Sequence, residues 1–139
     1  MLAVPRDRPP HGFNPSALND TARAIYARFA AAYRNEFGSD PTEESLAGFS
    51  AAWTLFHYVM PRAHDLGASA TAAAARSLDL PEGTLANGAG VKFADIPEAM
   101  GQNIRAASVI WQWQGVRHSV TVYPPVFATG TPGFIPLPR

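Results

Sequence analysis

Helix-forming patterns fill the first part of this chain, and no series of parallel strands accompanies them. The strand signal lies later, above all in residues 105–123, where apolar and polar residues alternate on both sides of a turn near Gln114 and Gly115. Helices interleaved with parallel strands form α/β sheets, whereas helices followed by an antiparallel hairpin form α+β folds. The order of elements therefore predicts an α+β chain of three helices and then a β-hairpin.

The composition is that of a folded domain and excludes several functional classes. The chain has 139 residues, of which 47% are hydrophobic and 16% charged, and its formal net charge is zero. Lys92 is its one lysine and no basic block exists, so nucleic-acid binding lacks an electrostatic basis. Cysteine is absent, which excludes disulfides and thiolate chemistry. Residues 1–10 do not read as a signal peptide, and no apolar stretch reaches the roughly 20 residues that span a bilayer.

Apolar residues three and four apart predict a first helix over residues 20–37, ended by Gly38. A second helix is expected to start with Asp40 as its N-cap and Pro41 in the first turn. This second helix is apolar nearly all round, so it should be buried on several faces. Pro61 predicts a kink or break in it, and Gly67 its end.

An alanine-rich third helix is expected over roughly residues 70–79, capped by Ser69. Residues 91–93 are a short strand candidate, and Pro97 could start a helical turn that Gly101 would end. We expect one incomplete domain over residues 1–139. Its parts are an extended lead-in (1–19), helices (20–80), strands and hairpin (90–123) and a Pro/Gly-rich tail (124–139), which is extended or loosely ordered.

Four pieces, in order, resemble the C-terminal portion of type I periplasmic solute-binding proteins of the leucine/isoleucine/valine-binding family. Together they cover about residues 3–125. They are Val4-Pro5-Arg6 with the helix ending in Glu36-Phe37-Gly38, then Gly48-Phe49-Ser50-Ala51-Ala52, then Gly90-Val91-Lys92-Phe93, and the closing hairpin Val109-Ile110-Trp111-Gln112-Trp113-Gln114-Gly115.

The resemblance implies a portion of a two-lobed α/β protein whose lobes close on an amino acid or similar small molecule. Phe49 would place an aromatic ring against the ligand, Ser50 could donate a hydrogen bond, and Phe13, near a crossing between lobes, would be a weaker contact. Alternatively, Phe49 belongs to a core stripe and Ser50 faces a backbone carbonyl. Trp111 and Trp113 could line a cleft, but packing against a helix is the reading we favour.

Other candidate chemistry has simpler explanations. His57 and His64 lie seven apart with Pro61 between them, whereas metal-binding pairs on helices are usually three or four apart. Asp65 beside His64 suggests a triad, but no nucleophile motif accompanies it. Glu43 and Glu44 are typical of a helix N-terminus. We therefore expect no catalytic residues, no metal and no cofactor.

The resemblance implies a non-catalytic solute-binding component of an ABC importer, extracytoplasmic, that presents its ligand to a membrane permease. Two alternatives stay open: a self-associating structural fragment without ligand, and the ligand-sensing domain of a signalling receptor. Both central sheets of the parent fold would be absent from this chain. Because the second helix would then lose the sheet that covers it, we also predict an intimate homodimer.

Overall fold

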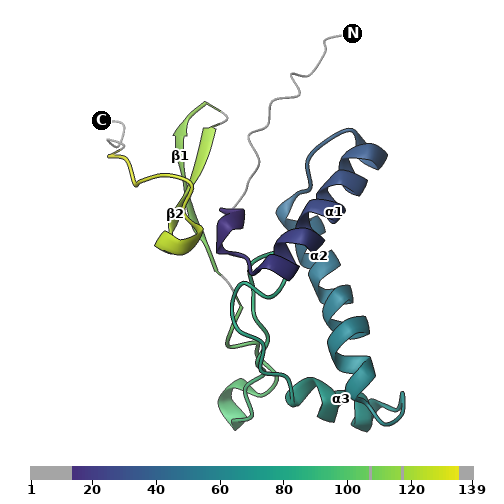
Figure 1. The fold of residues 1–139 in the computed structure, drawn as a ribbon. Helices are drawn as coiled ribbons and strands as arrows, with labels where there is room; N and C mark the ends of the chain where they lie inside the picture. Colours follow the sequence, from purple (N-terminus) through teal and green to yellow (C-terminus); the bar gives the residue numbers. More distant parts are fainter. Residues whose placement is uncertain (1–13, 107, 117, 135–139) are drawn as a thin grey trace.

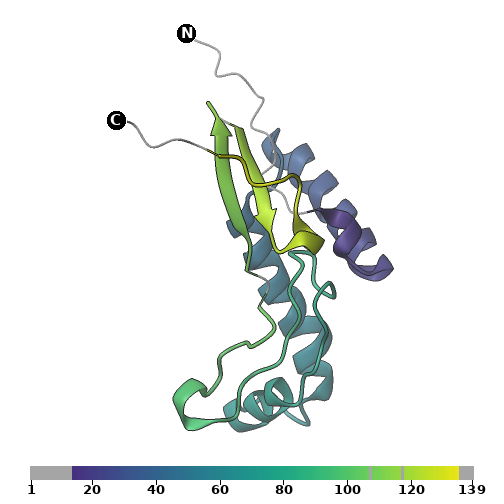
Figure 2. The same ribbon diagram turned by 90° about the vertical axis from the view of Figure 1, so that its left-hand side faces the viewer.

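The computed structural model describes residues 14–106, 108–116 and 118–134. Helices α1 (Asp20–Phe37), α2 (Glu43–Thr54) and α3 (Ala68–Arg76) precede a two-stranded antiparallel sheet of β1 (Ile110–Gly115) and β2 (His118–Tyr123). This order confirms the predicted α+β class. Figure 1 shows the hairpin on one side and α1 and α2 on the other, with a short 3-10 turn, Pro15–Ala17, between them. Figure 2 shows α3 at the far end of α2 from α1.

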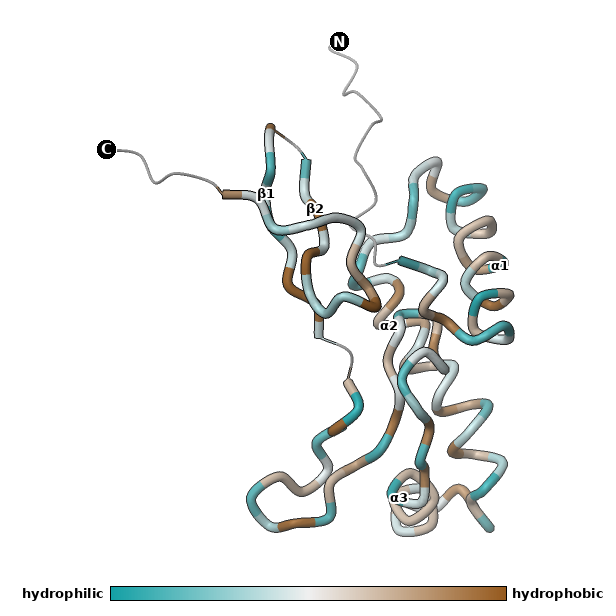
Figure 3. Tube along the Cα trace, turned by 60° about the vertical axis from the view of Figure 1, so that its left-hand side comes forward, coloured by the Kyte–Doolittle hydropathy of each residue, from teal (hydrophilic) through white to brown (hydrophobic). Residues whose placement is uncertain are grey.

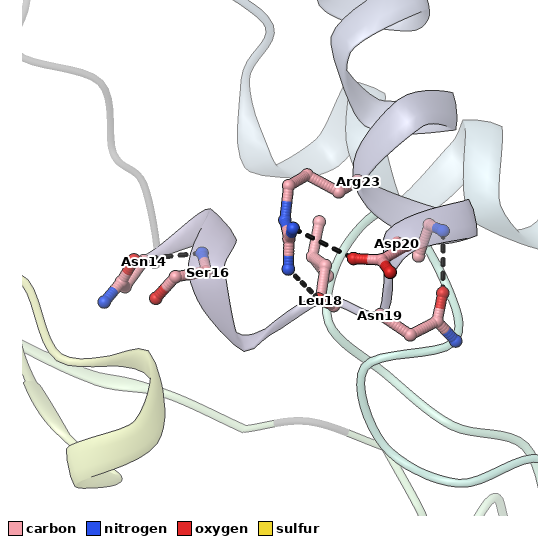
Figure 4. Close-up of polar contacts among 7 residues, drawn as sticks. Asn14, Ser16, Leu18, Asn19, Asp20 and Arg23 are labelled. Atoms are coloured by element: carbon pink, nitrogen blue, oxygen red, sulfur yellow. Dashed lines mark hydrogen bonds and ion pairs between the residues drawn. The ribbon is translucent and has the colours of Figure 1, made fainter.

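Helix α1 has the predicted bounds because both of its ends carry strong local signals. Asn19 is the N-cap, and its side-chain oxygen accepts a 2.8 Å hydrogen bond from the Ala22 backbone N–H (Figure 4). Arg23 fixes the approach to the helix by donating to the Leu18 carbonyl at 2.8 Å. Gly38 ends the helix in the left-handed conformation, with φ of 66°.

Helix α2 starts at a different cap from the one predicted. Thr42, not Asp40, is the N-cap, and its hydroxyl accepts a hydrogen bond from the Ser45 backbone N–H at 3.2 Å. The Asp40 carboxylate instead pairs with the Arg34 guanidinium across the turn from α1. A distant partner thus removes Asp40 from the capping role that its position in the sequence suggested.

The break predicted around Pro61 is confirmed. The α-helical pattern ends at Thr54, continues as one π turn over Leu55–Val59, and finishes as a 3-10 turn over Met60–Arg62. The prediction that Gly67 ends this element is wrong, because the element ends at Arg62 and Gly67 is the N-cap of α3. The predicted Ser69 cap of α3 is therefore also wrong. No helix in the described part of the chain has both the length and the apolar character needed to cross a membrane.

Stacked rings join α1 to α2. Phe29 on α1 and Phe49 on α2 lie face to face, with ring centroids 4.3 Å apart and planes at 26°. Tyr33 and Phe37 extend the row along α1, and Trp53 and His57 extend it along the second helix. We call this row of six rings the aromatic stack.

The main buried cluster lies between α3, the π turn after α2, and the loop that follows α3. It contains Val59, Ala74, Leu78, Leu85, Ala89 and Val91. The predicted strand at 91–93 is present only as two isolated bridges, Leu80 with Val91 and Phe93 with Asn103. Gly90 is needed at this crossing, because a Cβ there would meet the Leu80 carbonyl oxygen and the backbone of Pro81 and Glu82.

The hairpin is shorter than predicted at its start, since β1 begins at Ile110 rather than near residue 105. Trp111 and Trp113 share a face and touch edge to face at 5.4 Å, and they are 45% and 47% exposed. Their packing against a helix stays a prediction. The start of the tail is ordered, against expectation. Phe127 is buried, and the Gln112 side chain forms reciprocal 2.8 Å hydrogen bonds with the Gly133 backbone.

Candidate functional site

An open groove of about 690 Å³ lies between α2, α3 and the loops of residues 85–106, and we call it the α2–α3 groove. Figure 3 shows α3 and the loop after it beside the lower part of the second helix. Small side chains form the helical walls of the groove. The residues lining it are Ala47, Ser50, Ala51, Thr54, Leu55, Val59, Ala68, Thr71, Ala72, Ala75, Leu85, Asn87, Ala89, Val91, Phe93, Asn103 and Ala106.

Ser50 is the polar side chain that stands out in this groove. It is only 2% exposed, and its Oγ has no hydrogen-bond partner among the described residues. The backbone carbonyl of Ser50 accepts a bond from the Thr54 hydroxyl at 2.8 Å, which satisfies Thr54 but not the serine side chain. The alternative reading of Ser50, a hydroxyl facing a backbone carbonyl of this chain, finds no support among the described residues. A buried hydroxyl without a partner is destabilising, so a partner from outside these residues would be favourable.

Phe49 lies on a different side of the second helix from Ser50. Its ring is half-buried between Phe29 and Trp53 in the aromatic stack, and it is not among the residues that line the α2–α3 groove. Phe13 falls outside the described residues. The structure therefore places Phe49 and Ser50 in different surroundings, because adjacent helix positions point about 100° apart.

The charged side chains of the described residues lie outside the groove lining. The described residues that line the groove carry no charge. Next to it, Asp79 receives bonds from Lys92 Nζ at 2.9 Å and Arg105 Nη2 at 2.6 Å. The hydrogen bond from Lys92 mainly, and then the positive charges of Arg105 and Lys92, lower the pKa of Asp79 below its ordinary value. This arrangement ties the loop after α3 to the segment that leads into β1.

Asn103 is a structural residue that sequence reasoning missed. Its side-chain oxygen accepts bonds from the backbone N–H groups of Lys92 and Arg105, and its amide donates to the Gly90 carbonyl at 2.9 Å. These bonds replace part of a β-ladder and hold one wall of the groove. Its position directly after Gly101-Gln102, in an ambiguous stretch, gave no local signal of this role.

His57 and His64 lie in different surroundings. His57 stacks on Trp53 with centroids 3.7 Å apart, whereas His64 Nε2 lies 2.9 Å from the Asp65 carboxylate. Within residues 14–106, 108–116 and 118–134, no group of three or more His, Cys, Asp or Glu side chains could hold a metal ion.

Comparison with known proteins supports the resemblance found in the sequence. This chain is 33% identical over 109 residues to proteins named Leu/Ile/Val-binding protein homolog 8 from Brucella abortus, Brucella suis and Brucella melitensis. The match covers 78% of this chain but 26% of each relative, so the chain spans about a quarter of the length of the proteins it matches. No family model and no solved structure matches it.

The match confirms the predicted family resemblance. It spans 109 of the 139 residues of this chain. Its small share of each relative agrees with the reading of this sequence as one portion of a larger architecture. The chain is therefore similar to a C-terminal-like portion of the Leu/Ile/Val-binding protein family.

Proposed function

We propose that this chain contributes to a solute-binding component of an ABC importer for amino acids or related small molecules. The observation that carries this proposal is the 33% identity over 109 residues to Leu/Ile/Val-binding protein homologs. On this proposal the protein is not an enzyme, works outside the cytoplasm, and hands its ligand to a membrane permease. Binding of the ligand and its delivery to the permease would rely on closure of two lobes around the ligand.

Phe49 is the residue that we propose as the apolar contact to the solute. Its ring is half-buried and rigidly held by Phe29 and Trp53, so its free edge offers a fixed surface to an aliphatic or aromatic side chain. Phe13, outside the described residues, stays a predicted second contact. Ser50 lies in the groove on another side of the helix, and its hydroxyl stays a predicted hydrogen-bond donor to a ligand.

Thermal unfolding with added amino acids tests the solute-binding proposal. A ligand at 100 times its dissociation constant stabilises the protein by about 2.7 kcal/mol. We expect a rise in Tm with leucine, isoleucine, valine or an aromatic amino acid, and a smaller rise for Phe49→Ala. Phe37→Ala, an exposed member of the same aromatic stack, is the matched control. If none of these amino acids raises the Tm, solute binding by this chain is contradicted.

A second candidate is the self-associating chain without ligand. The specific observation in its favour is that several large apolar side chains are exposed, including Phe56 at 59%, Leu66 and Ile104. We propose that these residues drive the predicted homodimer when no other polypeptide covers them. Sedimentation velocity at micromolar concentration tests this, and a single monomeric species would contradict it.

A further inference from the structure

We propose that Asn87 is a site of spontaneous modification, at which the side-chain amide is hydrolysed without an enzyme, and that the folded loop around it controls the rate. Asn87 is followed by Gly88, and it is the one asparagine of this chain with glycine next to it. Glycine has no side chain that hinders its own backbone nitrogen, so asparagine before glycine reacts faster than asparagine before a bulky residue. This proposal does not rest on solute binding.

The fold requires the glycine of this pair. Gly88 has a φ of 85°, in the left-handed region that residues with a side chain rarely adopt. A Cβ at this position would also lie 3.0 Å from Cε1 of the buried Phe127 ring. Any larger residue at position 88 would therefore strain the loop, although it would slow the reaction at Asn87.

The reaction joins two neighbouring groups of the chain. The backbone nitrogen of Gly88 attacks Cγ of Asn87, the bond from Cγ to the side-chain nitrogen breaks, and ammonia leaves with the proton of the Gly88 N–H. Water then opens the resulting cyclic imide. Opening at the side-chain carbonyl gives aspartate. Opening at the main-chain carbonyl gives isoaspartate, in which the main chain runs through the side-chain carbon.

In the folded loop, the attacking nitrogen is held by another partner. The Gly88 N–H donates to the Leu85 carbonyl at 2.9 Å, and Oδ1 of Asn87 accepts from the Ala89 N–H at 3.2 Å. The bond to Oδ1 draws electron density from Cγ, which favours attack. The bond to Leu85 must break before the Gly88 nitrogen can lose its proton and approach Cγ. The reaction therefore needs the turn from Leu85 to Gly88 to open.

Packing makes this opening rare. Leu85 and Ala89 are buried members of the main cluster, so opening would expose apolar surface. Two further backbone bonds close the loop, from the Gly83 N–H to the Gly88 carbonyl at 2.8 Å and from the Leu85 N–H to the Ala89 carbonyl at 3.0 Å. We therefore expect Asn87 to react much more slowly in the folded chain than in the unfolded chain.

The products are less compatible with the loop than asparagine is. Isoaspartate at position 87 adds one carbon to the main chain between Leu85 and Ala89, so their mutual hydrogen bond and their places in the main cluster cannot both be kept. Either product also places a carboxylate among the uncharged residues that line the α2–α3 groove. Modification should therefore lower the stability of the chain.

Incubation of the intact chain at neutral pH, in buffer and in denaturing urea, tests the proposal. Mass spectrometry of proteolytic peptides measures the loss of the Asn87 amide, and chromatography separates the two products. Asn103 is the matched internal control, since it also lies in a loop but is followed by Ile104. In urea, Asn87 should react at least about ten times faster than Asn103, and at least about ten times faster than Asn87 does in buffer.

Equal rates at Asn87 in urea and in buffer would overturn the proposal, and so would equal rates at Asn87 and Asn103 in urea. Chains modified in urea are then returned to buffer and compared with Asn87→Asp. This variant carries the carboxylate without the longer main chain, and it keeps an oxygen for the Ala89 N–H. The isoaspartate form should fail to refold or should unfold at a lower urea concentration than Asn87→Asp. An isoaspartate form that unfolds at the wild-type urea concentration would also overturn the proposal.

Discussion

The two sides of the second helix differ: side chains of α1 cover one side, and an open groove lies along the other. Toward α1, large rings fill the space, and Phe49 stacks on Phe29 at 4.3 Å. Toward α3, alanines and a serine leave an open groove of about 690 Å³. Large side chains in contact bury one another, whereas small side chains lining a groove leave it open.

This difference separates residues that hold the chain together from residues that are available to a partner. Members of the aromatic stack should be sensitive to truncation in the isolated chain. The alanines that line the groove from α2 and α3 should tolerate change better, because the groove beside them is open. Substitutions on each side can therefore break or sharpen the comparison.

The largest effect is expected for Gly90→Ala in the loop that forms one groove wall. A Cβ at this position would come within 3 Å of backbone atoms of Leu80, Pro81 and Glu82, and backbone atoms cannot rotate away. We expect a loss of about 3 kcal/mol in the free energy of unfolding, measured by urea denaturation. Gly48→Ala on α2 is the control, because a Cβ there meets nothing within 4 Å. It should stabilise by about 0.5–1 kcal/mol. Similar effects at both positions would show that the wall is not tightly held.

Truncation of Phe49 on the other side of the helix is expected to be next in size. Phe49→Ala should lower the free energy of unfolding by about 2 kcal/mol, because it removes a half-buried ring and two ring contacts. Phe37→Ala should lower it by less than about 1 kcal/mol, since that ring is 64% exposed. Chemical denaturation measures both variants. An equal loss of unfolding free energy would mean that the contacts of Phe49 in the aromatic stack do not stabilise the packing of α1 on α2.

Acid sensitivity of the groove wall is expected to be smaller. The pKa of Asp79 is lowered in the folded state, mainly by its hydrogen bond from Lys92. Protonation is therefore easier in the unfolded chain, so the stabilisation is present above about pH 4 and is lost as the pH falls through the folded pKa. The stability difference between the wild type and Asp79→Asn should shrink between about pH 5 and pH 2.

The smallest effect is expected at the exposed flank of the groove. Phe56→Ser should change the stability of the isolated chain by no more than about 0.5 kcal/mol, since its ring is 59% exposed. The same change should weaken self-association in sedimentation experiments, because it removes apolar surface. A large loss of stability would show that Phe56 is already covered within this chain.

Local signals predicted much of the fold, and contacts between distant residues account for the errors. The ends of α1 were predicted because Gly38 and the apolar spacing act within the helix itself. The cap of α2 was wrong because Arg34 holds Asp40 from across the turn. The order of helices and hairpin follows from periodicity alone, whereas the exposure of Trp111 and Trp113 depends on which elements lie nearby.

The candidate site shows the same limit. Phe49 was chosen as a ligand contact through the family resemblance, and Ser50 because it is adjacent to Phe49. Their different surroundings depend on where α1 and α3 pack, which local patterns do not specify. The groove itself is built from alanines that read in the sequence only as helix formers. Asn103 gave no signal because its role depends on the backbone groups that it meets.

A crystal structure of this chain would test the contrast between the two sides of the second helix most directly. The account predicts that Phe49 stacks on Phe29, and that the α2–α3 groove is open beside a buried Ser50 Oγ without a partner among the described residues. A groove filled by side chains of this chain, or a Ser50 hydroxyl bonded within its own helix, would contradict it.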